Sequence, residues 1–67
     1  MNLQINDKVT VAGKQQYRVY NIMNNRVFFG KISQKTGKDL SAMNPHNLLT
    51  LTFAEIEKYT KLGTIVK

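Results

Sequence analysis

The most informative stretch is QYRVYNIMNNRVFFGKIS, at residues 16–33. It contains two segments rich in β-branched and aromatic residues, 16–23 and 26–33, which are separated by Asn24 and Asn25. Asparagine tolerates the left-handed backbone that a two-residue hairpin turn requires at both central positions. The stretch therefore predicts a β-hairpin, and we expect the remaining elements to be arranged around it.

The turn also sets a register for the two strands. The predicted pairs are Met23 with Arg26, Ile22 with Val27, Tyr20 with Phe29, and Arg18 with Lys31. Both faces of this hairpin are then largely apolar, which favours a bent hairpin wrapped into a barrel, with Gly30 placed for the bend. A register shifted by one residue would bring Tyr17 and Phe28 to the face that otherwise carries Tyr20 and Phe29.

Short alternating segments flank the hairpin. Residues 7–12 place Val9 and Val11 on one face and predict a half-buried strand, with a turn at residues 13–16. Residues 38–43 predict a fourth strand, which Asn44-Pro45 would end because proline cannot donate to a strand ladder. Residues 64–66 are expected to add a short last strand.

A helix over about residues 52–62 is predicted from its ends. Thr52 and Glu55 have the spacing of a capping box, and Leu51 and Ile56 have the spacing of a hydrophobic staple. Gly63 is a favourable residue for the helix end. The 1–67 chain is thus expected to be one mainly β domain, a small five-stranded barrel with one short helix before the last strand.

This order of elements resembles that of the small SH3-like barrels. The resemblance lies in the pattern DKVTVAGKQQYRVYNI and extends over residues 7–33, where a valine-rich strand precedes a longer strand with Tyr17-x-Val19. The long helix departs from the single helical turn usual before the last SH3 strand, and in this respect the chain is similar to chromo-like domains. Such barrels include DNA, RNA and protein binders, so the resemblance implies a fold and no single function.

Composition argues against several functional classes. The 67 residues include no cysteine, one histidine and four carboxylates, a poor inventory for a metal site, a cofactor site or an active site. We therefore expect neither a metal nor a cofactor, and no enzyme activity. An enzyme would require His46 to meet Asp39 or Glu55. The apolar runs are too short to span a membrane and residues 1–8 do not resemble a secretory signal, so a cytoplasmic location is expected.

The charge points towards polyanions. The formal net charge is +6, and residues 8–38 contain seven Lys or Arg and no carboxylate. Basic side chains bind nucleic acid by neutralising phosphates and releasing counterions. The predicted nucleic-acid-binding residues are Lys14, Arg18, Tyr20, Arg26, Phe29, Lys31, Lys35 and Lys38. Tyr20 and Phe29 would stack on bases, unless they belong to the core of the barrel, as scarce aromatic residues usually do.

Two further interpretations stay open. The QKTGK segment at residues 34–38 could hold a phosphate, although a solvated turn is favoured because the spacing is not that of a P-loop. The protein could instead be an adaptor or inhibitor, as accessory proteins of phages or plasmids are, that binds an acidic surface of a partner protein. Exposed strand edges would also permit homodimerisation.

Overall fold

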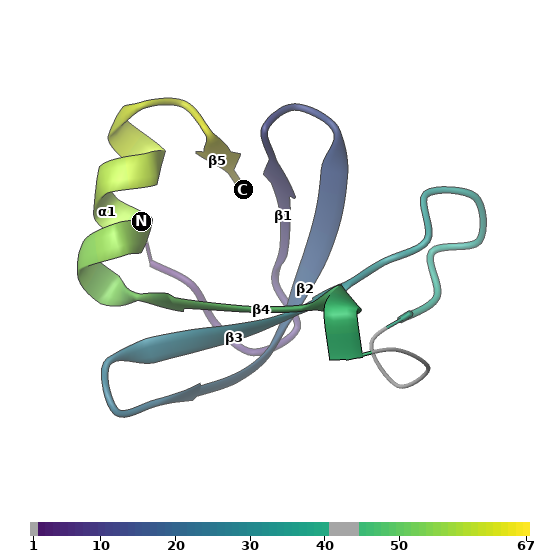
Figure 1. Cartoon of the computed structure of the whole chain (residues 1–67), viewed down its shortest axis with the longest axis horizontal. Coiled ribbons are helices and arrows are strands. Elements are labelled where there is room, and N and C mark those ends of the chain that lie inside the picture. The colour runs from purple at the N-terminus through teal and green to yellow at the C-terminus, as the bar shows by residue number, and fades with distance from the viewer. Residues whose placement is uncertain (1, 41–44) are drawn as a thin grey trace.

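Five antiparallel strands form one curled sheet in the computed structural model, which describes residues 2–40 and 45–67. The strands follow the order β4-β3-β2-β1-β5 across the sheet, which curls into a half-barrel (Figure 1). The elements are β1 (Lys8–Val11), β2 (Gln15–Met23), β3 (Arg26–Lys31), the 3-10 helix η2 (Pro45–Asn47), β4 (Leu48–Thr52), α1 (Phe53–Lys61) and β5 (Ile65–Val66). The predicted class, mainly β with one short helix before a short last strand, is confirmed.

The turn between β2 and β3 has the predicted geometry. Asn24 and Asn25 have φ values of 53° and 60°, the left-handed conformation of a two-residue hairpin turn. Next to the turn Met23 lies opposite Arg26, and Ile22 lies opposite Val27, as predicted.

A β-bulge at Tyr20 changes the register further along the hairpin. The pairing shifts between Val19 and Asn21, so Val19 lies opposite Phe29. The predicted pairing of Tyr20 with Phe29 is therefore wrong. The side chain of Asn21 accepts a hydrogen bond of 2.9 Å from the amide of Ile22 beside this irregularity. Because a bulge places two residues opposite one, every residue before it in β2 is displaced by one position.

The same shift separates two basic residues that were expected to face each other. Arg18 lies opposite Gly30, and Tyr17 lies opposite Lys31. The predicted pair of Arg18 with Lys31 is thus wrong, and the two basic side chains belong to opposite faces of the sheet because neighbouring side chains alternate.

The core lies between the inner face of the curled sheet and α1, which packs against β4 and β5. Its buried members come from β1, β2, β3, α1 and β5: Val9, Val19, Val27, Phe29, Ile56 and Ile65. Among the described residues, no helix has the length and apolarity needed to cross a membrane.

The fourth strand is formed by a later segment than predicted. Residues 41–43 of the predicted 38–43 strand lie outside the described residues, and Asp39 makes only an isolated bridge to Ile32. The strand that pairs with β3 is β4, in which Leu49 lies opposite Phe29 and Leu51 opposite Val27. The leucine–threonine alternation of β4 thereby directs two leucines to the core.

The predicted capping box at the start of α1 is present. The Thr52 hydroxyl accepts a hydrogen bond of 3.1 Å from the amide of Glu55, and the Glu55 carboxylate accepts one of 3.0 Å from the amide of Thr52. Leu62 is the C-cap, and Gly63 follows with a φ of 77°. The helix therefore begins and ends where the local sequence signals place it.

Candidate nucleic-acid interface

The four carboxylates of the chain all have structural roles. Three form salt bridges: Asp7 with Lys67 at 3.0 Å, Asp39 with Arg18 at 3.8 Å, and Glu57 with Lys61 at 3.9 Å. Glu55 caps α1. Seven of the ten Lys and Arg side chains therefore have no salt bridge within residues 2–40 and 45–67, namely Lys8, Lys14, Arg26, Lys31, Lys35, Lys38 and Lys58.

Four of these lysines gather at one end of the sheet, which we call the basic end: Lys14, Lys31, Lys35 and Lys38. The β1–β2 turn supplies Lys14, the end of β3 supplies Lys31, and the following loop supplies the other two. In Figure 1 this loop extends from the sheet on the side away from α1. All four belong to the predicted nucleic-acid-binding set.

Glutamine side chains hold the loop beside the β1–β2 turn. The Gln34 amide nitrogen donates to the carbonyl of Lys14, and that of Gln15 donates to the carbonyl of Ile32 at 3.3 Å. The amide of Ile32 in turn donates to the carbonyl of Gln16 at 3.0 Å. These contacts fix the two segments that carry the lysines relative to each other.

The loop at residues 33–38 does not offer a backbone cradle for phosphate. The amides of Lys35 and Thr36 both donate to the Ser33 hydroxyl at 3.3 Å, and that of Gly37 donates to the Ser33 carbonyl at 2.8 Å. The amide of Lys38 donates to the Thr36 hydroxyl at 3.3 Å. Since these backbone donors are already used, the ammonium groups of Lys35 and Lys38 are the charged donors of this loop that remain for a phosphate.

The two predicted stacking residues lie in different environments. Phe29 is 0% exposed, so its ring belongs to the core and is inaccessible to a base. Tyr20 is 48% exposed at the bulge, and its ring lies 6.1 Å from that of Phe28 on the outer face of the sheet. Of the two, only Tyr20 presents an aromatic surface to solvent.

The two predicted arginines lie outside the basic end. Arg18 is on the outer face of β2, where its guanidinium pairs with the Asp39 carboxylate. Its Nε atom is buried and has no hydrogen-bond partner among the described residues. Arg26 follows the β2–β3 turn and lies opposite Thr52, at the start of α1. Each arginine is thus close to an element that carries a carboxylate.

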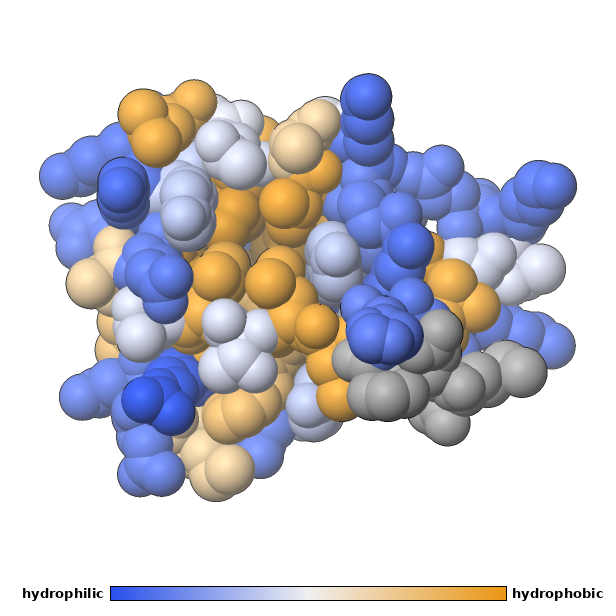
Figure 2. Space-filling view, in the orientation of Figure 1, coloured by the Kyte–Doolittle hydropathy of each residue, from blue (hydrophilic) through white to orange (hydrophobic). Residues whose placement is uncertain are grey.

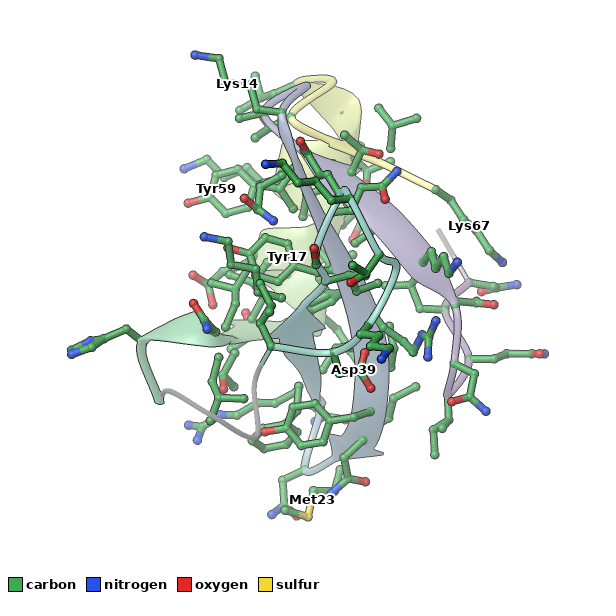
Figure 3. All side chains as sticks on the ribbon, turned by 90° about the vertical axis from the view of Figure 1, so that its right-hand side faces the viewer. Lys14, Tyr17, Met23, Asp39, Tyr59 and Lys67 are labelled. Atoms are coloured by element: carbon green, nitrogen blue, oxygen red, sulfur yellow. The ribbon has the colours of Figure 1, made fainter. Side chains whose placement is uncertain are left out.

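Sequence reasoning missed the aromatic residues on the open side of the half-barrel. The term open side refers to the part of the inner face that lies between α1 and the β1–β2 hairpin. This part faces the viewer in Figures 1 and 2. Figure 2 shows hydrophobic residues at the centre of this region and hydrophilic residues on both sides. Tyr17 from β2 and Tyr59 from α1 both project to this side in Figure 3. The alternative register pointed to Tyr17, but nothing in the sequence indicated that Tyr59 projects to the same side of the molecule.

Two carboxylates have lowered pKa values, and both stabilise the fold away from the basic end. The pKa of Asp7 is lowered mainly by the amide hydrogen bond from Gln4 and then by Lys67. The pKa of Glu55 is lowered mainly by the amide of Thr52. The described part of the chain contains no cluster of three or more His, Cys, Asp or Glu residues suited to a metal ion.

Comparison of the chain with models of protein families, with curated proteins and with solved structures found no match. A functional proposal therefore has to come from the charge, shape and chemistry of the surface itself.

Proposed function

We propose that this protein is a small SH3-like barrel that binds nucleic acid through the phosphate-contacting lysines of the basic end. The strand order and the helix before the last strand support the fold. The observation that supports the function is the grouping of Lys14, Lys31, Lys35 and Lys38 without a salt bridge to any carboxylate within the described residues. Unpaired lysines keep their full charge for a ligand, whereas a paired lysine must first lose its partner.

The expected binding mode is electrostatic. Each lysine that neutralises a phosphate releases a counterion, so affinity falls with salt by a slope of about 0.9 per contact on a logarithmic scale for duplex DNA. Phosphate contacts position a nucleic acid without reading its sequence. Weak sequence preference and strong salt dependence are therefore expected together.

The test is fluorescence anisotropy with labelled oligonucleotides at about 50 and 200 mM salt. The variant Lys14→Gln/Lys35→Gln removes two exposed charges of the basic end, and Lys8→Gln/Lys61→Gln removes two exposed charges elsewhere. Both variants have the same net charge. We expect the first to lower affinity about tenfold and the salt slope by about two, and the second to have a much smaller effect.

Two results would contradict the proposal. Equal losses in the two variants would mean that binding follows net charge and not the basic end. Absence of binding to any oligonucleotide at the lower salt concentration would reject nucleic acid as the ligand.

A further inference from the structure

The open side places two tyrosines next to the basic end. Tyr17 and Tyr59 are partly buried against the core, and they come from the two sides of the opening, β2 and α1. Both rings project to the same side of the molecule as Lys14 (Figure 3). The region therefore combines aromatic rings with a cation from the β1–β2 turn.

The ring of Tyr17 is held by the core beneath it. It meets Phe29 edge to face, with 6.4 Å between ring centroids and 75° between ring planes. Since Phe29 is fully buried, this contact fixes the orientation of Tyr17 before any ligand arrives. A fixed ring loses less conformational entropy on binding than a mobile one.

A lysine of the same helix lies over the ring of Tyr59. The Lys58 ammonium lies 5.9 Å from the ring centroid, within the range of a cation–π contact. Neither the Tyr17 nor the Tyr59 hydroxyl makes a hydrogen bond with another group in the part of the chain that the structure covers. Both hydroxyls are thus available to a polar ligand.

Basic residues lie near the tyrosines, and the two carboxylates of α1 already have partners: Glu55 caps the helix and Glu57 pairs with Lys61. Lys31 lies opposite Tyr17 in the β2–β3 ladder, and directly opposite residues of an antiparallel pair point to the same face. Arg18, which pairs with Asp39, belongs to the other face of β2. Lys67, the partner of Asp7, lies on the side of the molecule away from the tyrosines (Figure 3).

We infer that the nucleic acid is single-stranded, with its phosphates on the basic end and its bases against Tyr17 and Tyr59. This inference rests on the proposed function. Base stacking on an aromatic side chain requires an accessible base face, which a single strand offers and a duplex hides. Stacking is also tolerant of sequence, which agrees with contacts made mainly to phosphates.

The outer face offers an internal control. Tyr20 is the more exposed ring, but its neighbours on that face include the Arg18–Asp39 pair, whose carboxylate repels phosphate. If the ligand binds at the open side, Tyr59→Leu should weaken binding and Tyr20→Leu should not. Tyr59 is the preferred variant because Tyr17 contacts the core more closely.

The experiment compares a labelled single strand of about 12 nucleotides with the duplex of the same sequence, at about 50 mM salt. We expect the single strand to bind at least about tenfold more tightly than the duplex. We expect Tyr59→Leu to weaken single-strand binding about fivefold or more, to leave duplex binding within about twofold, and to retain the native circular dichroism spectrum. Quenching of intrinsic tyrosine fluorescence by the unlabelled single strand gives an independent measure of stacking in the unmodified protein.

The possible failures are distinguishable. Equal affinity for single strand and duplex, or equal effects of Tyr59→Leu and Tyr20→Leu, would overturn this inference while leaving the proposed function intact, provided that Lys14→Gln/Lys35→Gln still weakens binding. No binding to either probe would overturn both. Binding of a poly-glutamate peptide without binding of nucleic acid would also overturn both, and would assign the surface to an acidic protein partner.

Discussion

Val19 lies directly opposite Phe29 in the β2–β3 ladder, and both side chains are 0% exposed. This pair forms the centre of the core, since the bulge at Tyr20 turns Val19 inwards and Tyr20 outwards. Phe29 also contacts Tyr17 on the inner face and faces Leu49 of β4. Its ring therefore connects the hairpin to the rest of the sheet.

Phe29→Ala is expected to destabilise the protein by about 3–5 kcal/mol, the usual cost of removing a buried phenylalanine. A domain of this length has a total stability of about 3–10 kcal/mol, so the variant should be largely unfolded or close to it. Urea denaturation followed by circular dichroism measures the change. Tyr20→Ala is the matched control, with an expected cost below about 1 kcal/mol because its ring is exposed. A folded Phe29→Ala variant of near-normal stability would contradict the core position.

Features that depend on a few neighbouring residues could be predicted from the sequence. The Asn24-Asn25 turn and the Thr52–Glu55 capping box each act within four residues, and both have the predicted geometry. The bulge at Tyr20 could not be predicted, because no local signal in residues 16–23 marks it and it shows only in the pairing of β2 with β3. The position of β4 likewise depends on pairing with β3, and residues 38–43 had a similar local alternation.

The same distinction applies to the candidate site. The basic end could be recognised from charge, since exposed lysines remain on the surface whatever the register. The aromatic part could not, because a shift of one residue exchanges the faces on which Tyr17 and Tyr20 lie. Tyr59 is brought to the open side only by the packing of α1 between β4 and β5.

The β2–β3 turn predicts a stabilising substitution. Asn25 has a φ of 60°, which glycine adopts without the steric cost of a side chain. Asn25→Gly is expected to raise the free energy of unfolding by a few tenths of a kcal/mol, to about 1 kcal/mol at most, because Asn-Gly is a preferred pair for this turn. Asn25→Val is expected to lower it by about 1–2 kcal/mol. Urea midpoints in the reverse order would contradict the turn geometry.

The capping box should contribute measurably to stability. Thr52→Ala removes the acceptor for the Glu55 amide and is expected to cost about 1 kcal/mol. Thr52→Ser retains the hydroxyl and should restore most of this loss. Thermal unfolding of the three proteins at neutral pH measures the difference. Equal melting temperatures for the alanine and serine variants would show that the cap contributes nothing.

Stability is expected to fall in acid, partly through Asp7. Its carboxylate accepts the Gln4 amide at 2.8 Å and contacts the Lys67 ammonium at 3.0 Å, and both lower its pKa in the folded state. A lowered folded-state pKa contributes stability above the unfolded value, and this contribution is lost as pH falls through the folded value. The loss should therefore begin below about pH 5. Asp7→Asn should flatten the acid side of the melting-temperature profile, whereas Glu57→Gln, at an exposed carboxylate 3.9 Å from Lys61, should change it less.

Asp39 is the only carboxylate between residues 8 and 54, and it lies 3.8 Å from the Arg18 guanidinium near the loop of the basic end. Asp39→Asn changes the formal net charge from +6 to +7 and removes the carboxylate next to Lys38 of the basic end. Because the salt bridge is substantially exposed, its loss should cost less than about 1 kcal/mol of stability. Nucleic-acid affinity should rise about two- to fivefold because a carboxylate next to Lys38 no longer repels phosphate, and the salt slope should change little because Arg18 lies on the other face of β2. Anisotropy titrations at two salt concentrations measure both effects. Weaker binding by a folded Asp39→Asn variant would show that Asp39 positions Arg18 for the ligand, and the boundary of the interface would then have to include the outer face of β2.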